Sequence, residues 1–401
     1  MSFHPIGRIS PSQGRIPIAM IDRVWKTSVL ATISLRSLEQ SSLTGRIGTS
    51  QRLYNIRSSY MVNAAIAGLG WWGKTLVESV SGVSDDLRFV VGVDPFASDE
   101  TKAFTDEHGM ELYTEFEAAL ADPKVDAVVL ATPHSMHTDQ VVAAAEAGKH
   151  VFCEKPFALH KADAERSVAA TQKAGVTLGL DYNRRLHPEM TKLRERIDSG
   201  DLGTILHIEA NMTFPNALFL KGDAWRASRE EAPCGGLTPM GIHAIDGMID
   251  LCGEIDEVYC QSFRRAVEID ADDTTSVLFR MKEGMSGYLG TMTATGGGFS
   301  FQVFGSKGYV RLEGMTHIAG APSEERRKKC FGTCIFKPIK GPAEVWQADE
   351  VDIVREVLEE FGKAVTNGTP YFIPLEEMIH GVAVTETIVK SAASHQVEKI
   401  V

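Results

Sequence analysis

The chain has 401 residues, of which 43% are hydrophobic and 23% are charged, a composition typical of globular proteins. No run of about 18 uncharged apolar residues occurs, which excludes a membrane-spanning helix of ordinary length. Lys and Arg number 41 against 53 Asp and Glu, and the net charge of −12 argues against a broad surface for nucleic acids or anionic lipids. We therefore expect a small-molecule partner, and neither nucleic acid nor membrane.

The amino-terminal segment, residues 1–60, differs in composition from the rest. Residues 1–61 contain eight basic residues, two acidic residues and eleven serines. This pattern is typical of a transit peptide, and it equally fits upstream sequence without a folded role. We favour a disordered extension or upstream sequence, because the expected folded domain needs nothing before Met61.

The cysteines give no sign of a disulfide framework or of a zinc motif. Six are spread over the chain, and the closest two are separated by three residues, not by the two of a zinc knuckle. We expect reduced thiols, a cytoplasmic location and no bound metal. The six are Cys153, Cys234, Cys252, Cys260, Cys330 and Cys334.

From Met61 onward, short apolar runs alternate with stretches of helical periodicity. This alternation predicts a parallel sheet with crossover helices, an α/β architecture. The expected strands are 64–67, 89–93 and 127–131, and the expected helices are 73–80 and 98–107.

The first strand leads directly into Gly68-Leu69-Gly70-Trp71-Trp72-Gly73, a G-x-G-x-x-G turn that opens a helix. Its glycines allow a tight turn, close approach of the backbone to a diphosphate, and close helix–strand packing. Asp94 follows 21 residues after Gly73, at the end of the second strand. An acid there binds the adenosine ribose and repels a 2′-phosphate, so the sequence predicts NAD, with NADP less favoured.

Three stretches together resemble one known family. They are AIAGLGWWG at 65–73, TP-x-x-x-H at 132–137 and AGKHVFCEKP at 147–156. Over about residues 62–395 the chain is similar to the Gfo/Idh/MocA family of NAD(P)-dependent oxidoreductases, named after glucose–fructose oxidoreductase and inositol dehydrogenase. The resemblance implies an amino-terminal Rossmann domain with a doubly wound parallel sheet, which we place at 61–183, and a carboxyl-terminal α+β domain at 184–401.

The second domain is expected to form a mostly antiparallel open sheet. Alternating segments recur after residue 204, and turn sequences such as Lys282-Glu283-Gly284 join neighbouring segments. Helices are expected to cover one face of this sheet, and in relatives the other face makes a dimer contact. We therefore expect a homo-oligomer, either a dimer or a tetramer. The expected strands are 205–212, 257–262, 276–281, 286–293, 301–304 and 309–313, and the chain ends in helices at 351–365 and 376–391.

The E-K-P segment carries the first candidate catalytic residue. Lys155 ends a strand of the open sheet, where such sheets bind ligands, and its ammonium group can stabilise a developing alkoxide or transfer a proton. In the resembled family this lysine has that role, and the resemblance places Glu154 and Lys155 at the nicotinamide end of the cofactor. It also assigns cofactor contacts to the preceding loop, at Thr132, Pro133, His134 and His137.

The resemblance further assigns substrate contacts to the second domain. Arg184 would bind a substrate hydroxyl or carboxylate, although a salt bridge at the domain junction is an equally good interpretation. Trp225 and Arg226 match a Trp-Arg pair that contacts nicotinamide and substrate in relatives.

His243 is the second candidate catalytic residue. It lies in G-x-H-x-x-D, where His243 and Asp246 share one helix face. By analogy with the family, His243 removes the substrate hydroxyl proton and also contacts substrate. Many polyol-oxidising relatives have an Asp four residues before this His, whereas this chain has Pro239. Either Asp246 orients His243, or Lys155 and His243 suffice, or the chemistry differs from simple polyol oxidation.

These features favour a dehydrogenase that moves hydride between nicotinamide and a secondary alcohol or carbonyl carbon of a sugar, polyol or cyclic diol. An NAD-retaining glycosidase is an alternative, since some relatives use bound NAD without net redox. A non-catalytic ligand sensor is another; Pro239 supports it, and the presence of both Lys155 and His243 opposes it. A zinc enzyme built on His134, His137 and Cys153 is a remote fourth hypothesis.

Overall fold

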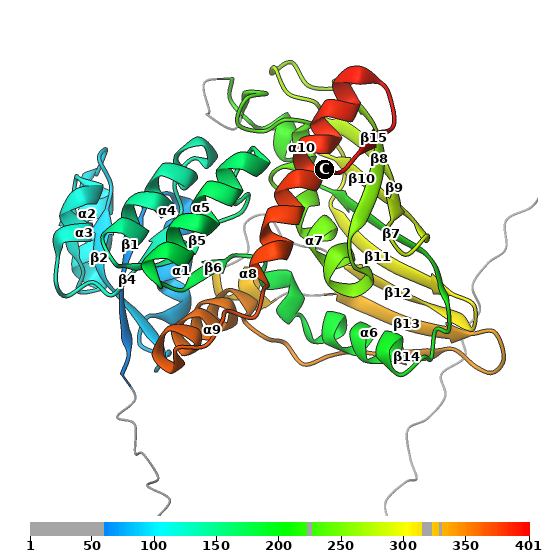
Figure 1. The fold of residues 1–401 in the computed structure, drawn as a ribbon, viewed down its shortest axis with the longest axis horizontal. Helices are drawn as coiled ribbons and strands as arrows, with labels where there is room; N and C mark the ends of the chain where they lie inside the picture. The colour runs from blue at the N-terminus through cyan, green and yellow to red at the C-terminus, as the bar shows by residue number, and fades with distance from the viewer. Residues whose placement is uncertain (1–59, 223–226, 315–322, 329–330) are drawn as a thin grey trace, which may run out of the picture. The chain divides into compact units, whose positions relative to one another are not determined.

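A computed structural model describes residues 60–222, 227–314, 323–328 and 331–401 (Figure 1). These residues contain one six-stranded and one nine-stranded β-sheet, with helices packed on both. In this part of the chain, no helix has the length and apolar character needed to cross a membrane.

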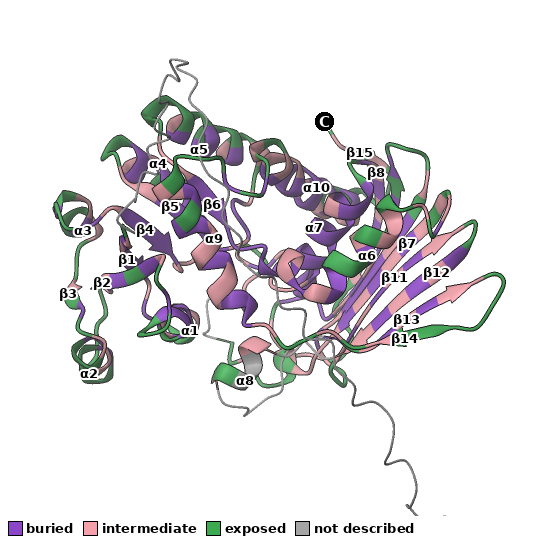
Figure 2. Ribbon diagram, turned by 90° about the horizontal axis from the view of Figure 1, so that it is seen from below, coloured by how far each residue is buried: buried purple, intermediate pink, exposed green. Residues whose placement is uncertain are grey.

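The first sheet is entirely parallel and has the strand order β3-β2-β1-β4-β5-β6. Every residue of β4 is buried, as Figure 2 shows, because helices cover both faces of the sheet. The order reverses between β1 and β4, which is where open α/β sheets bind ligands. The strands are β1 (Val62–Ala67), β2 (Leu87–Val93), β3 (Glu111–Tyr113), β4 (Ala127–Leu130), β5 (His150–Cys153) and β6 (Leu178–Leu180).

Five helices connect these strands, and buried apolar residues of α1, α3, α4 and α5 pack in the core of the sheet. The first begins at Trp71, two residues before the expected start, because Gly70 acts as its N-cap. A short 3₁₀ turn, η1 (His134–Met136), leads into the fourth helix. The helices are α1 (Trp71–Val80), α2 (Asp99–Glu107), α3 (Phe116–Ala121), α4 (His137–Glu146) and α5 (Lys161–Ala174).

The second sheet has the order β14-β13-β12-β11-β7-β10-β9-β8-β15. All its neighbouring strands are antiparallel except β7 and β10, which are parallel. The sequence prediction of a mostly antiparallel sheet is thereby confirmed. The strands are β7 (Ile205–Thr213), β8 (Ile255–Phe263), β9 (Thr274–Met281), β10 (Ser286–Met292), β11 (Gly298–Gly305), β12 (Gly308–Gly314), β13 (Phe331–Pro338), β14 (Glu344–Trp346) and β15 (Glu398–Lys399).

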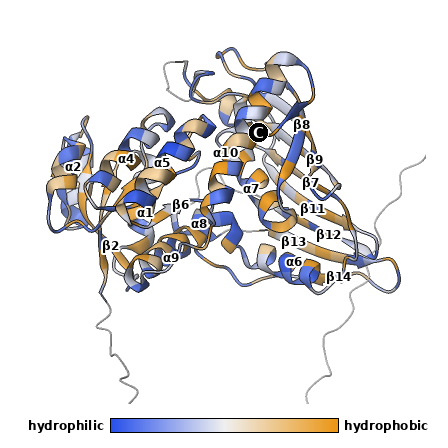
Figure 3. Cartoon of the chain, viewed as in Figure 1, coloured by the Kyte–Doolittle hydropathy of each residue, from blue (hydrophilic) through white to orange (hydrophobic). Residues whose placement is uncertain are grey.

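One face of the second sheet packs on helices. Buried side chains of β7 and β11 share a core with residues of α6 (Pro188–Asp198), α7 (Gly241–Cys252) and α10 (Leu375–Ser394). Figure 3 shows hydrophobic residues along α7, which packs between α10 and the strands. Burial alternates along β7 and β9, so the opposite face is the more exposed one.

The last two long helices return toward the first sheet. Phe361 of α9 (Ile353–Asn367) packs against Phe152 of β5, with ring centroids 5.5 Å apart, and belongs to the core of the first sheet. Helix α10 contacts α5 on one side and β8 and α7 on the other. The predicted domain boundary at 183/184 stays a prediction. Residues of α9, far beyond that boundary in the sequence, also belong to the core of the first sheet. The remaining elements are η2 (Asn183–Leu186), η3 (Asn216–Leu218), η5 (Gly235–Leu237) and α8 (Ser323–Lys328).

Candidate active site

The glycine turn has the geometry that a diphosphate requires. Gly68 has φ +92°, and a Cβ there would lie 2.6 Å from the Ala131 carbonyl oxygen. A Cβ on Gly73 would lie 1.9 Å from the Gly68 oxygen, so helix and strand approach too closely for a side chain. A Cβ on Gly70, in contrast, would meet nothing within 4 Å. The space above Gly70, at the start of α1, is thus open for a phosphate group to approach the free helix amides.

Asp94 follows β2 at the same edge of the sheet. Its Oδ1 accepts a 2.9 Å hydrogen bond from the Phe96 amide, and the residue is half-buried. This turn fixes the carboxylate at the strand end, where the sequence predicts a contact with the adenosine ribose. The residues present therefore fit a dinucleotide.

The loop after β4 is held by its two histidines. His137 is fully buried, and its ring nitrogens lie 2.8 Å from the Pro156 oxygen and 3.0 Å from the Thr132 oxygen. His134 Nδ1 lies 2.8 Å from the Glu231 carbonyl oxygen. Both rings thus tie the loop to neighbouring segments. A cofactor contact through Pro133 or these histidines stays a prediction.

The zinc hypothesis finds no support in the described part of the chain, where no three His, Cys, Asp or Glu side chains form a group that would hold a metal ion. The thiol of Cys153 instead donates to the Glu154 carbonyl oxygen at 3.3 Å.

The E-K-P segment lies directly after β5, beside the glycine turn. The Glu154 carboxyl group is 5% exposed and accepts hydrogen bonds from the Trp72 indole and from the Lys155 amide. The Lys155 ammonium group crosses to the other domain and donates a 3.0 Å hydrogen bond to the Pro239 carbonyl oxygen. Glu154 and Lys155 therefore connect the glycine turn to the second domain.

His243 lies in the first turn of α7, four residues after Pro239. Its ring is 7% exposed and makes a T-shaped contact with Tyr182, with centroids 6.3 Å apart. Because Lys155 binds Pro239, two residues before α7 begins, its ammonium group and the His243 imidazole both lie near the start of this helix.

Asp246 has a partner that the sequence analysis missed. Its carboxylate accepts three hydrogen bonds of 2.6–3.1 Å from the Arg185 guanidinium group. Arg185 also pairs with Asp250 and Glu377, and burial raises the pKa of Asp246 to about 7 while Arg185 opposes the rise. A buried cluster of this kind holds η2, α7 and α10 together. The expected role of Asp246 in orienting His243 stays a prediction.

Of the predicted substrate residues Arg184, Trp225 and Arg226, the structure describes only Arg184. Arg184 is 9% exposed, and its guanidinium group lies 5.5 Å from the centre of the Phe299 ring, at the junction of the domains. Trp225 and Arg226 lie outside the described residues.

Asp181 is a second residue that the sequence analysis did not assign. It follows β6 as Glu154 follows β5, and the two strands pair in register through Cys153 and Leu180. Asp181 is fully buried, and its carboxyl group lies within hydrogen-bonding reach of that of Glu154. The available signal was an acid directly after each of two neighbouring parallel strands.

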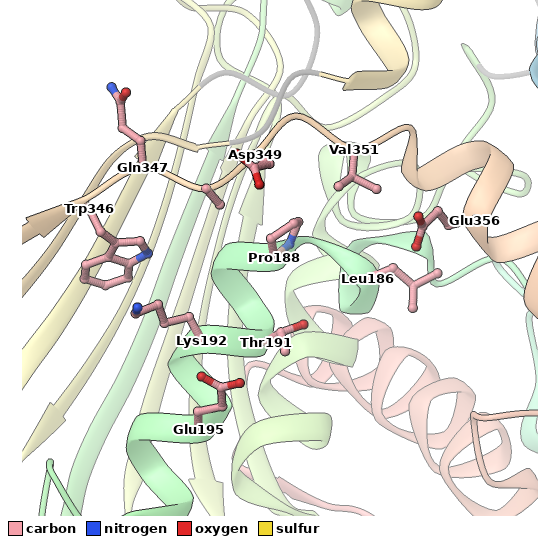
Figure 4. A pocket seen from close by; sticks show the side chains of 11 residues that line it. Leu186, Pro188, Thr191, Lys192, Glu195, Trp346, Gln347, Asp349, Val351 and Glu356 are labelled. Carbon is pink, nitrogen blue, oxygen red and sulfur yellow. The ribbon is translucent and has the colours of Figure 1, made fainter. Parts of the chain in front are cut away.

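A cavity of about 530 Å³ lies elsewhere, between α6 and the chain that follows β14 (Figure 4). Lys192 and Glu195 of α6 line one side, and Trp346, Asp349 and Glu356 line the other. None of the predicted site residues lines this cavity, so its size does not mark the active site.

Both domains of the chain match models of known protein families. Residues 62–182 match the family model described as "Oxidoreductase family, NAD-binding Rossmann fold", and residues 190–311 match the GFO/IDH/MocA C-terminal domain. The chain is 30% identical over 275 residues to myo-inositol 2-dehydrogenase of Thermotoga maritima, covering 65% of this chain and 78% of that protein. It is 31% identical over 273 residues to inositol 2-dehydrogenase of Rhizobium meliloti, covering 64% and 77%.

Solved structures share the fold. The aldose-aldose oxidoreductase of Caulobacter crescentus superposes with a TM-score of 0.74 at 22% identity, over 85% of this chain and 100% of that one. A levoglucosan dehydrogenase in complex with NADH and levoglucosan gives 0.71 at 19% identity, over 85% and 100%.

The parallel sheet, the open glycine turn and the two family models together define a two-domain oxidoreductase that uses a nicotinamide dinucleotide. The chain belongs to the GFO/IDH/MocA family of oxidoreductases. The resemblance seen in the sequence is thus confirmed, as is the predicted activity, that of an NAD(P)-dependent dehydrogenase.

Proposed function

We propose that the chain oxidises a secondary alcohol of a cyclic polyol or sugar with NAD, using Lys155 and His243. The observation that carries this proposal is the 3.0 Å hydrogen bond from Lys155 to Pro239, which places the ammonium group of one domain at the helix that bears His243 of the other. A substrate bound between the two domains would be shielded from water and held against the reacting groups.

Gly68, Gly70 and Gly73 would hold the cofactor diphosphate against the start of α1, and Asp94 would hold the adenosine ribose. The Asp94 carboxylate favours NAD, because it would repel the 2′-phosphate of NADP. When bound, the nicotinamide ring supplies the hydride acceptor.

Two side chains would handle the substrate oxygen. His243 takes the hydroxyl proton, and the Lys155 ammonium group stabilises the negative charge that develops on that oxygen. Asp246 holds the helix of His243 through its bonds with Arg185. Arg184, Trp225 and Arg226 are proposed to position the other substrate hydroxyls.

The proposed substrate class rests on the relatives, several of which are named as inositol dehydrogenases. Cofactor choice varies among them, since a D-xylose 1-dehydrogenase of Haloarcula marismortui is named for NADP. We also propose a cytoplasmic location and a homo-oligomer. On the open face of the second sheet, Leu278 is 56% exposed and lies in register between Tyr259 and Tyr288. Such an apolar row suits a contact with a second copy, which light scattering measures.

The proposal is tested by incubating the purified chain with NAD and a panel of inositols, aldoses and anhydrosugars while NADH absorbance is followed. We expect NADH formation with at least one of them and a loss of roughly 10²-fold or more in kcat for His243→Asn. Release of reducing sugar without NADH would instead support the glycosidase, and ligand binding without any turnover would support the sensor.

A further inference from the structure

Two buried acids stand side by side where the first sheet meets the second domain. Cys153 and Leu180 are partners in the parallel pairing of β5 and β6, so Glu154 and Asp181 are the next residues of neighbouring strands. The Asp181 amide donates a 3.0 Å hydrogen bond to the Cys153 carbonyl oxygen, which fixes this arrangement. Glu154 is 5% exposed and Asp181 is fully buried.

The hydrogen bonds around Glu154 and Asp181 allow the two carboxyl groups to share one proton. Glu154 accepts from the Trp72 indole and the Lys155 amide. Within the described residues, no donor reaches either Asp181 oxygen with ordinary hydrogen-bond geometry, although the Asn183 amide points at this carboxyl group. Two carboxylates in contact repel each other strongly, and a proton on one of them turns the repulsion into a hydrogen bond.

The charged groups that face the pair are Lys155, on the same segment, and Arg184 of η2. Tyr371, from the loop between α9 and α10, binds the Leu180 carbonyl oxygen, and burial raises the pKa of its phenol. Burial also raises the pKa of Glu154 well above its ordinary value, with Asp181 adding to the rise and Lys155 opposing it. These surroundings favour one negative charge on the pair.

We propose that Asp181 is a positioning residue that shares one proton with Glu154, so that the pair carries a single negative charge beside Lys155 and holds its backbone in place. The proposal rests on the proposed function only in taking Lys155 as the group that acts on substrate. Asp181 itself acts through Glu154, which joins Trp72 of the glycine turn to the Lys155 amide.

The proton is detected without any turnover. A glutamine at position 154 is uncharged like the protonated acid, and its oxygen can accept from Trp72 while its amide donates to Asp181. The bond from the Lys155 amide is lost at every pH, so this loss does not change the pH dependence. A raised pKa means that the folded chain keeps a proton that the unfolded chain releases, so this residue makes stability fall as pH rises above about 4.3. We therefore expect the Tm of Glu154→Gln minus the Tm of the wild type to increase by about 3 °C between pH 5 and pH 8.

Glu146→Gln, an exposed acid on α4, is the matched control, and its Tm difference should not change with pH. Infrared spectra at pH 7 supply a second readout. The chain with ¹³C-labelled Glu and Asp should show a protonated-carboxyl band that disappears in the Glu154→Gln, Asp181→Asn double variant. A constant Tm difference together with no such band would overturn the proposal.

The positioning role has its own measurement. Asp181→Ala removes the partner of Glu154, and we expect a loss of about tenfold in kcat and a displaced pH profile, with a smaller change in KM for NAD. Asp181→Asn retains one negative charge and a donor to Glu154, so it should regain most of the lost rate. An Asp181→Ala profile that matches the wild type would contradict the role. If the wild type itself forms no NADH, the proposed function fails, while the Tm and infrared results still decide whether the proton is shared.

Discussion

The Lys155 ammonium group and the Pro239 carbonyl oxygen are joined by a 3.0 Å hydrogen bond between the two domains. Pro239 stands where many polyol-oxidising members of the family have an Asp. A backbone carbonyl, unlike a carboxylate, neither titrates nor carries a full charge. The acceptor at this contact is therefore the same at every working pH.

Removal of the Lys155 ammonium group should abolish most turnover. We expect Lys155→Ala to lower kcat by roughly 10²–10³-fold, because no other group is proposed to stabilise the charge on the reacting oxygen. Stopped-flow measurement of NADH formation gives the rate, and binding of NAD should weaken far less. Lys173→Ala, at an exposed position of α5, should match the wild type. Full activity in Lys155→Ala would refute the assignment.

Substitution of Gly70 should weaken cofactor binding without lowering the stability of the fold. Its backbone, with φ −68° and ψ −175°, suits any residue, and a Cβ would project into open space. Gly70→Ala should therefore fold with the Tm of the wild type but bind NAD at least about tenfold more weakly, because the methyl group occupies the path of the diphosphate. Calorimetric titration provides the affinity.

Gly73→Ala is the contrasting variant to Gly70→Ala. A Cβ at Gly73 would lie 1.9 Å from the Gly68 oxygen, so this change should lower Tm as well. Equal NAD affinity for Gly70→Ala and the wild type would show that the diphosphate lies elsewhere.

Asp94 should control the choice of cofactor. In Asp94→Ser the carboxylate that repels a 2′-phosphate is absent, and we expect the ratio of kcat/KM for NAD over NADP to fall by roughly 10²-fold. The exposed acid Asp99, in the first turn of α2, provides the control variant Asp99→Ser. If the wild type already prefers NADP, the role given to Asp94 is wrong.

His187 should make the chain sensitive to acid. It is buried against Phe331, and burial lowers its pKa from 6.5 to about 3, with Arg184 adding to the effect. The unfolded chain therefore binds a proton that the folded chain does not, and stability is lost as pH falls below about 6.5. The loss attributable to this residue between pH 7 and pH 5 is about 2 kcal/mol.

His187→Phe retains an aromatic ring and removes the titration. Urea unfolding at the two pH values should show that about 2 kcal/mol of the acid loss is absent from His187→Phe. His395→Asn, at an exposed position, should behave as the wild type does. An unchanged acid loss in His187→Phe would contradict the prediction.

Much of the first sheet was predictable from the sequence, because strands such as β1, β2 and β4 are short apolar runs and the glycine turn marks where the first helix begins. The edge strand β3 is not an apolar run and was not expected. The second sheet was predicted in class but not in detail. Strands β13 and β14 and helix α6 were not expected. The parallel pairing of β7 with β10 joins segments about 80 residues apart and has no local signal.

Prediction of the candidate site from the sequence is limited in the same way. The spacing of His243 and Asp246 correctly places them on one helix, but it says nothing about Arg185, which reaches Asp246 from a different element. The pairing of Glu154 with Asp181 likewise depends on the register of β5 and β6. Contacts between elements that are distant in sequence depend on tertiary packing, and a single sequence does not reveal which elements pack together.

The central claim is that hydride passes from a substrate carbon to the cofactor, and isotope transfer tests it most directly. The chain is incubated with NAD and its best polyol, deuterated at the carbinol carbon, and the NADH formed is analysed by NMR. We predict one deuterium per NADH at C4 of the nicotinamide, on a single face of the ring. Product formation with no deuterium at C4, or with NADH absent, would contradict the account.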